Sequence, residues 1–269
     1  MKIVGLNLNA RWTRNIQKFW VILAENGLLT VLEILSAKFL QRKKPLAIRF
    51  MSRSLYIRPG TPDLNVAFSC FSGEFQELSN YIGEDEVGII IDAGGYIGTS
   101  AIALAEMFPC AKVVAIEPDA ANYSILTRNV EHYERISSIN AALVPHETDE
   151  QFVVEDRGAG EWGLVTSKLL QPKEGDQLVS AVTIDQILRE AGGSDVLCIK
   201  MDIEGAEREM LTNSTAWLTK TKALMIELHP DIYPDIQSIF EVACHEREIK
   251  KSSGEKFISV KSRSAKEAV

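Results

Sequence analysis

The 269-residue sequence lacks the features that mark metal-stapled, secreted or membrane-spanning proteins. Its four cysteines are widely separated and include no CxxC pair, so neither a zinc site nor a disulfide framework is indicated. Its longest unbroken apolar run near the start, FWVILA, is far short of the roughly 20 residues that span a bilayer. No secretory signal is evident, because basic residues continue through that stretch. We therefore expect a soluble, cytoplasmic protein that at most rests on a membrane surface.

Acidic residues are scarce at the start of the chain. Residues 1–60 hold eleven Lys and Arg against two Glu, a net charge of +9, whereas the whole chain carries −8. A basic front end therefore precedes an acidic body, and this favours an anionic or membrane-bound partner. Nucleic acid is not an expected partner, because the body is acidic and the basic stretch lacks a recognition motif.

Apolar residues recur at helical spacing from Asn15 to Leu40, interrupted by ENG at Glu25–Gly27. The pattern predicts two short amphipathic helices that end in QRKK. Helices that lie in a membrane interface have an apolar stripe with flanking lysines, so peripheral membrane contact is one interpretation. Packing on the main domain as a lid, with the lysines in solvent, is the other.

After residue 55 the pattern changes to buried strands that alternate with helices, typical of βαβ units in a parallel sheet. We expect one α/β domain with a doubly wound, mostly parallel Rossmann-like sheet. Thr183 and Gln186 are spaced as a capping box, and Gly192 and Gly193 as the stop of that helix. With no repeat or low-complexity linker, the expected division is an N-terminal helical extension (1–54), the main domain (55–260) and a polar tail (261–269). The expected elements are a short strand from Leu55 and a helix with Thr61 or Asp63 near its N-cap; strands VGIIIDAGG, KVVAIEP, ISSINAAL, QFVVED, LVSAVT, VLCIKMDIEG, ALMIELHP and KFISV; and helices TSAIALAEMF, DAANYSILTRNVEHY and TIDQILREAGG.

A glycine loop follows the first of these buried strands, where ligands bind in such sheets. Gly94, Gly95 and Gly98 occupy it, but Ala93 stands where a dinucleotide fingerprint needs its first glycine. Alone this partial match does not identify the ligand.

Two acids narrow the choice of ligand. Glu117 ends the second strand at about the 20-residue spacing at which an acid binds a ribose hydroxyl pair. Asp92 would repel a pyrophosphate but attract an ammonium or sulfonium group. A cationic, ribose-bearing ligand such as S-adenosylmethionine is therefore expected in preference to NAD.

These stretches resemble the FkbM-type family of S-adenosylmethionine-dependent, class I methyltransferases. The likeness rests on YIRPGTPDL, IIDAGGYIG, AIEPDAANYSILTRNV, INAAL, TIDQIL, IKMDIEGAEREML and IELHP, and IKMDIEGAE is the most specific. The family loop usually reads D-x-G-A-N-x-G, and here Gly95 and Tyr96 replace the Ala and Asn. The resemblance implies that Asp92, Gly94 and Gly98 hold the methionine part of the cofactor, Glu117 its ribose, and Asn140 lies by the adenine.

A second group of polar residues ends two later strands. Alternation puts Lys200, Asp202 and Glu204 on one side of one strand end, and Glu227 and His229 on one side of the next. If those strands are neighbours, the side chains converge as an acceptor site beside the methyl donor. His229 and its rival Asp202 are candidate catalytic bases. Clustered carboxylates could instead bind Mg²⁺, although no metal ligand is assigned, and the acids from Glu204 onward also suit the first turn of a helix.

The sequence thus predicts an S-adenosylmethionine-dependent O-methyltransferase that acts on a hydroxyl of a small molecule or glycan, such as a sugar, a lipid-linked sugar or a polyketide-type acceptor. An NAD-dependent oxidoreductase on the same sheet is the alternative enzyme, and Asp92 and Ala93 count against it. A non-catalytic binding module is the third hypothesis.

Overall fold

The computed structural model describes residues 3–156, 160–161, 163–169, 177–193, 195–213 and 216–261, with side chains from Trp12 onward. The chain forms two compact units, Met1–Gly73 and Glu74–Val269. The division expected at 54/55 falls inside strand β2 (Arg53–Ile57). Lys261 ends strand β13 (Lys256–Lys261), and the rest of the expected tail, 262–269, lies outside the described residues.

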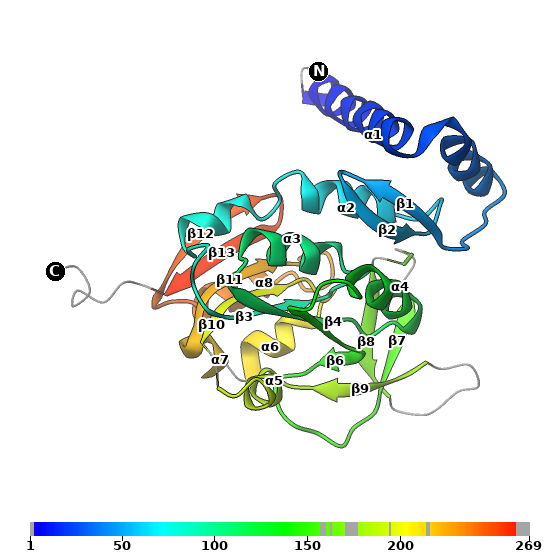
Figure 1. Cartoon of the computed structure of the whole chain (residues 1–269). Coiled ribbons are helices and arrows are strands. Elements are labelled where there is room, and N and C mark those ends of the chain that lie inside the picture. Colours follow the sequence, from blue (N-terminus) through cyan, green and yellow to red (C-terminus); the bar gives the residue numbers. More distant parts are fainter. Residues whose placement is uncertain are drawn as a thin grey trace. The chain divides into compact units, whose positions relative to one another are not determined.

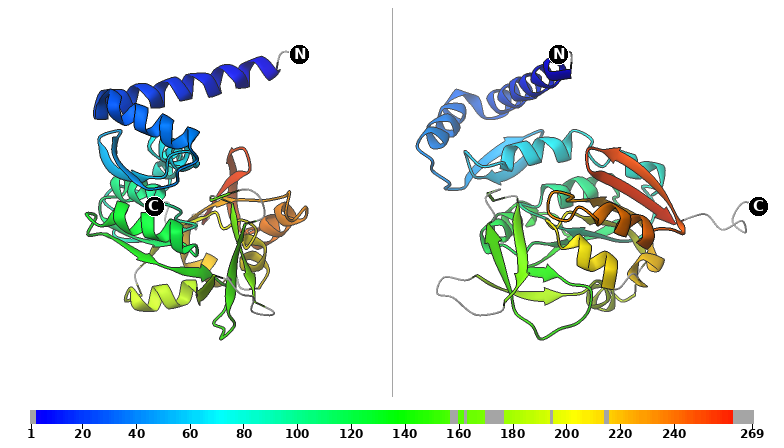
Figure 2. Two further views of the ribbon diagram at one scale, coloured as in Figure 1. Left: turned by 90° about the vertical axis from the view of Figure 1, so that its right-hand side faces the viewer. Right: turned by 180° about the vertical axis from the view of Figure 1, so that it is seen from behind.

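The first unit opens with helix α1 (Ile3–Phe39), which is broken at Gly27 (φ 81°, ψ 174°). The break lies in the predicted ENG stretch, so the two helical limbs are confirmed (Figure 2). The first limb begins well before the expected Asn15, because the preceding stretch contains no proline to stop it.

Part of α1, Trp12–Phe39, is long and apolar enough to cross a membrane by length and composition, with a mean hydropathy of 1.5. This stretch was missed from the sequence alone, where only uninterrupted apolar residues were counted, because single polar residues divide its apolar residues. A core helix or a signal sequence passes the same test. The break at Gly27 divides the stretch, and the second limb, residues 28–39, is only about 18 Å long at 1.5 Å per residue. A bilayer core is about 30 Å thick, so this limb alone is too short to span it.

Beside α1 the first unit contains an antiparallel hairpin, β1 (Leu46–Phe50) with β2, and helix α2 (Asp63–Phe71). The Asn26 side chain joins α1 to β1, donating to Arg49 O and accepting from Arg49 N at 2.7 Å each. The predicted helix begins at Asp63, so Thr61 and Asp63 lie on either side of its N-cap, Pro62, which makes no side-chain cap hydrogen bond. Asp63 accepts three hydrogen bonds from buried Arg58.

The second unit is built on a sheet in the order β12-β13-β11-β10-β3-β4-β5 (Figure 1). The five strands from β11 to β5 are parallel, and the β12–β13 hairpin is an antiparallel edge. Chain order reverses between β3 and β10, so this is the switch point at which such sheets bind ligands. The expected doubly wound, mostly parallel Rossmann-like sheet is confirmed. Its strands are β3 (Gly88–Ala93), β4 (Ala111–Ile116), β5 (Ile136–Ile139), β10 (Val196–Met201), β11 (Thr221–Glu227), β12 (Arg247–Ser253) and β13.

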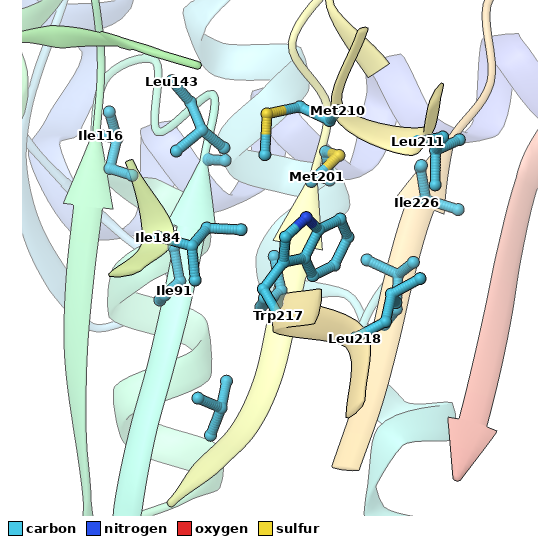
Figure 3. Packing of buried hydrophobic residues seen from close by; sticks show 14 of the residues in the cluster. Ile91, Ile116, Leu143, Ile184, Met201, Met210, Leu211, Trp217, Leu218 and Ile226 are labelled. Atoms are coloured by element: carbon cyan, nitrogen blue, oxygen red, sulfur yellow. The ribbon is translucent and has the colours of Figure 1, made fainter. Parts of the chain in front are cut away.

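Helices cover both faces of this sheet. On one face the side chains of Ile91, Met201 and Ile226 pack against Trp217 and Met210 (Figure 3). Asp92 and Lys200 alternate with these apolar residues and so point to the opposite face. Two helices lie on that opposite face, α3 (Thr99–Met107) and α4 (Ala120–Val130). Four helices pack on the first face: α5 (Ile184–Glu190), α6 (Glu207–Asn213), α7 (Ala216–Lys220) and α8 (Ile236–Ala243). The unit begins with a 3-10 turn, η1 (Gln76–Asn80).

A smaller sheet in the order β6-β9-β7-β8 follows β5. The single strand predicted over ISSINAAL is wrong, since the chain leaves the large sheet at Asn140, whose side chain donates to Glu117 O and Pro118 O at 2.8 and 2.9 Å. The glycine-rich stretch between β7 and β8, residues 157–163, lies partly outside the described residues, and β8 was not predicted. The strands are β6 (Ala141–Leu143), β7 (Phe152–Asp156), β8 (Leu164–Lys168) and β9 (Leu178–Val182).

The predicted capping box at the start of α5 is confirmed. Thr183 Oγ1 accepts from Gln186 N at 3.1 Å, and Gln186 Oε1 accepts from Thr183 N at 2.8 Å. We expect Thr183→Ala to lower the free energy of unfolding by about 0.5–2 kcal/mol, because the N-terminal N–H groups lose an acceptor. Urea unfolding measures this, and Thr183→Ser, which keeps the hydroxyl, should stay near the wild-type value. Equal losses in both variants would contradict the capping role.

Candidate active site

The loop between β3 and α3 is held very close to its neighbours. Gly94 and Gly98 have left-handed backbones, with φ of 81° and 84°. A Cβ on Gly94 would lie 1.8 Å from Asp202 O, and one on Gly98 would lie 3.0 Å from Val130 Cγ1. The N–H groups of Gly94 and Gly95 both donate to Ile116 O. Glycine is therefore required at position 94, both by φ and by the approach of the chain that follows β10.

We expect Gly94→Ala to lower the free energy of unfolding by about 2–5 kcal/mol, combining left-handed strain with overpacking against a backbone oxygen. Urea unfolding tests this. Gly192→Ala is the matched control, since Gly192 has a φ of 75° and a Cβ there would meet nothing within 4 Å. Gly192→Ala should lower the free energy of unfolding only by the left-handed strain, about 1–2 kcal/mol. Equal losses at the two positions would show that the contact with Asp202 is unimportant.

Asp92, at the end of β3, is fully buried and has two partners. Its Oδ2 accepts from Ser100 Oγ at 2.5 Å, and its Oδ1 lies 3.2 Å from Lys200 Nζ without forming a hydrogen bond. Lys200 stands opposite Asp92 in the β10–β3 register and also donates to Gly94 O at 2.7 Å. Asp202 Oδ2 lies 3.9 Å from the same ammonium. Two carboxylates, those of Asp92 and Asp202, thus share the ammonium of Lys200, and these three side chains together have a formal net charge of −1.

Glu117, at the end of β4, is buried and fixes the glycine loop. Its Oε2 accepts from Tyr96 N at 2.9 Å, while Oε1 accepts from Asp119 N and Asn122 Nδ2. Burial raises the pKa of Glu117 to about 7 in spite of these donors. A carboxylate has about four acceptor positions, so one remains on Oε2. Tyr96, where the family pattern has Asn, has a φ of 50°, a conformation that Asn adopts more easily.

The second predicted cluster forms at the carboxyl ends of β10 and β11, which are neighbours as expected. His229 Nε2 lies 3.8 Å from Asp202 Oδ1 and 3.4 Å from Glu204 Oε2, and His229 Nδ1 lies 3.3 Å from Glu207 Oε1. Glu227 is paired elsewhere, with Lys256 Nζ at 3.1 Å. The structure therefore brings His229 together with three carboxylates from the segment that follows β10.

Electrostatics distinguish the members of this cluster. Burial lowers the pKa of His229, but Glu207, Glu204 and Asp202 outweigh it and raise the pKa to about 9. Burial and the nearby Asp202 raise the pKa of Glu204 to about 7. At neutral pH His229 is therefore an imidazolium, and this counts against its predicted role as a base.

A cation is the alternative occupant of this cluster. Single ligand atoms of Asp202, Glu207 and His229 lie within 4.8 Å of one another. Glu207, however, already accepts from Ile203 N at 2.7 Å and Gly205 N at 2.6 Å, so its carboxylate holds the loop. Mg²⁺ prefers oxygen ligands and retained waters to an imidazole. We assign no metal to these residues.

A cavity of about 320 Å³ opens beside the cluster. Its lining includes Glu204, Gly205 and Glu209, together with residues of the small sheet such as Phe152 and Thr166. The sequence placed Glu204 either at the end of the strand, on the side of Lys200 and Asp202, or in the first turn of the next helix. Glu204 lies in the loop before α6 with a φ of 54°, and neither that backbone nor the cavity has a sequence signal.

The match to a family model decides the identity of the chain. Residues 92–248, more than half of the sequence, match the methyltransferase FkbM domain. The chain belongs to the FkbM methyltransferase family. This FkbM protein is an S-adenosylmethionine-dependent methyltransferase, as the sequence predicted, and its matched region begins at Asp92 and includes the whole polar cluster.

Other comparisons are distant. No curated protein matches the chain. Three solved structures similar to it are precorrin-6y C5,15-methyltransferase from Geobacter metallireducens (10% identity, 70% of this chain and 87% of that chain), ribosomal protein L11 methylase from Lactobacillus delbrueckii subsp. bulgaricus (11%, 77% and 83%) and the fibrillarin pre-rRNA processing protein from Methanococcus jannaschii (12%, 81% and 82%), each with a TM-score of 0.41. The names of these three proteins refer to different substrates, and likenesses this distant do not indicate the acceptor.

The residues at the switch point of the FkbM protein fit S-adenosylmethionine. Asp92 Oδ1 is a buried oxygen without a hydrogen bond, suited to a cationic group. Glu117 retains one acceptor position, suited to a ribose hydroxyl. Asn140, assigned by the resemblance to the adenine end, is exposed and lies against the backbone of Glu117. The net charge of −1 near Gly94 is unsuited to a pyrophosphate, and this counts against NAD.

Proposed function

We propose that this methyltransferase transfers the methyl group to a hydroxyl of a small molecule or glycan, bound in the 320 Å³ cavity beside Glu204. One observation carries the proposal: polar contacts run without interruption from the glycine loop to the cavity wall. They pass from Gly94 O to Lys200, then to Asp202, His229 and Glu204. The methyl donor and the acceptor would therefore occupy the two ends of one polar group.

The size of the cavity supports a small acceptor. Its volume is at the lower end of the roughly 300–1,000 Å³ typical of small-molecule sites, large enough for a single sugar ring or a comparable group. Its wall combines apolar residues, such as Val165 and Ile232, with hydroxyl and carboxylate side chains that can bind hydroxyl groups.

Bound S-adenosylmethionine would supply an electrophilic methyl group. The protein then has to hold the acceptor oxygen in line and remove its proton, and correct positioning alone contributes several kcal/mol. Asp202 is the proposed base, because its half-buried carboxylate lies between Lys200 and His229. Charged His229 would hold the Asp202 carboxylate in place.

An acceptor panel tests the proposal. Purified protein is incubated with S-adenosylmethionine labelled in the methyl group and with sugars, lipid-linked sugars, phenols and polyketide alcohols, and with RNA and protein as rivals. We expect label only in an acceptor hydroxyl. Label in RNA or protein, or at a nitrogen or carbon atom, would overturn the proposal. Cofactor binding with no transfer to any acceptor would favour a non-catalytic binding module.

A further inference from the structure

Exposed apolar side chains of this protein are concentrated in α1 and the residue that follows it, Leu40. Among the described residues, nine of the fourteen large hydrophobic side chains that face solvent lie between Trp12 and Leu40. Leu29 is 82% exposed and Phe39 is 87% exposed. An apolar surface of this kind normally marks a site of protein or membrane interaction. These nine residues, here called the α1 stripe, are Trp12, Phe19, Trp20, Leu28, Leu29, Leu32, Leu35, Phe39 and Leu40.

A groove of about 940 Å³ lies within the first unit, next to the α1 stripe. Its lining includes apolar side chains such as Ile22, Ile34 and Phe68. Phe19 and Leu35 belong both to its lining and to the α1 stripe, so the two apolar surfaces are continuous. The groove is large enough to receive a hydrocarbon chain along these apolar side chains, and polar and basic residues make up the rest of its lining.

The charges around these surfaces identify the partner. Arg14, Lys18 and Lys38 line the groove. Arg42, Lys43 and Lys44 follow the α1 stripe closely, while only two acids, Glu25 and Glu33, lie within residues 1–60. Basic residues beside an apolar, tryptophan-bearing helix are the combination that binds anionic lipid surfaces. Trp and Tyr also prefer the membrane interface, and the stripe contains both Trp12 and Trp20.

The first unit holds this surface in a fixed form. Glu25 accepts from Ser52 N, Asn26 is bonded twice to Arg49, and Lys18 donates to Asn65. The break at Gly27 is thereby tied to the β1–β2 hairpin, so the two limbs cannot merge into one straight spanning helix without losing these bonds. A helix pair fixed in this way can lie in the plane of a membrane.

We propose that residues 1–73 dock the enzyme on an anionic bilayer, with the α1 stripe in the interface and the acyl chain of one anionic phospholipid in the groove. The proposal is independent of the acceptor and of the methyl transfer. It decides between the two sequence interpretations of this segment in favour of membrane contact over a lid.

Vesicle sedimentation of the full chain tests the docking. We expect the protein to sediment with phosphatidylcholine vesicles that contain phosphatidylglycerol, and at least ten-fold less with pure phosphatidylcholine. Joint substitution Leu29→Asp and Phe39→Asp should reduce binding at least ten-fold without unfolding, since both side chains are already exposed. Val242→Asp, at another exposed apolar position (73%), is the matched control and should bind like the wild type. Failure to sediment with anionic vesicles, or an equal loss in the control, would overturn the proposal.

Two further measurements sharpen this test. The triple variant Arg42→Gln, Lys43→Gln, Lys44→Gln should lose most of the preference for phosphatidylglycerol. A phosphatidylglycerol with a photoreactive acyl chain should label groove residues such as Ile34 and Phe68. Labelling confined to Leu29 and Phe39 would overturn the groove assignment. Binding of single-stranded RNA without any binding to vesicles would overturn the whole proposal in favour of a nucleic-acid surface.

Discussion

Asp202→Asn is expected to reduce methyl transfer about 100- to 10,000-fold, the usual contribution of a positioned base. The substitution keeps the size of the side chain and its place between Lys200 and His229, but the amide cannot accept the acceptor's proton. The backbone of Asp202, which donates to Ala93 O at 3.1 Å, is untouched, so the glycine loop should keep its shape. Single-turnover transfer to the best acceptor of the panel measures the loss, and calorimetry should show S-adenosylmethionine affinity within about three-fold of the wild type.

Neighbouring substitutions identify which group is the base. Asp231→Asn changes an exposed carboxylate just after β11 and should leave transfer unchanged. His229→Gln should cost less than Asp202→Asn, since it removes a charge that holds Asp202 rather than the proton acceptor. If Glu204→Gln gave the large loss and Asp202→Asn did not, the proton would go to Glu204. A requirement for added Mg²⁺, abolished by chelation, would contradict the metal-free assignment of this cluster.

Much of the second unit follows from sequence periodicity. Continuous apolar runs predicted β3, β4, β10 and β11 because these strands are buried on both faces, and the capping box predicted the start of α5. Strand β12 was missed since it is an edge strand: its residues, REIKKSS, are mostly exposed and carry no apolar pattern. Strand β1 was also missed, although its partner β2, of equal length, was predicted from Leu55 onward. Burial against tertiary neighbours therefore decides which strands a sequence reveals.

The candidate site was predictable by type of residue but not by partner. Sequence spacing brought Asp202 and His229 to adjacent strand ends. It did not reveal that Lys200 pairs with Asp92, because cross-strand register is set by packing and not by local sequence. Nor did it reveal that the pKa of His229 is raised, since three carboxylates meet the imidazole only in the folded chain. The roles assigned to Gly94, Glu117 and Asn140 stay predictions for the cofactor complex.

Lys200→Met should lower the free energy of unfolding by about 3–5 kcal/mol at pH 7, the usual cost of removing one partner of a buried ion pair. Asp92 is fully buried, and the side chain of Lys200 is 11% exposed. Methionine fills a similar volume, but it leaves the Asp92 carboxylate with no cation and Gly94 O with no donor from this side chain. Urea unfolding at pH 7 is the measurement.

A second substitution identifies the cause of this loss. In Lys200→Met the Asp92 carboxylate stays buried with no cation, and a buried charge without a partner is costly. The double variant Asp92→Asn, Lys200→Met removes the buried charge and should recover most of the loss at pH 7. A deficit that the second substitution does not relieve would mean that Lys200 stabilises the sheet by packing and not by its charge.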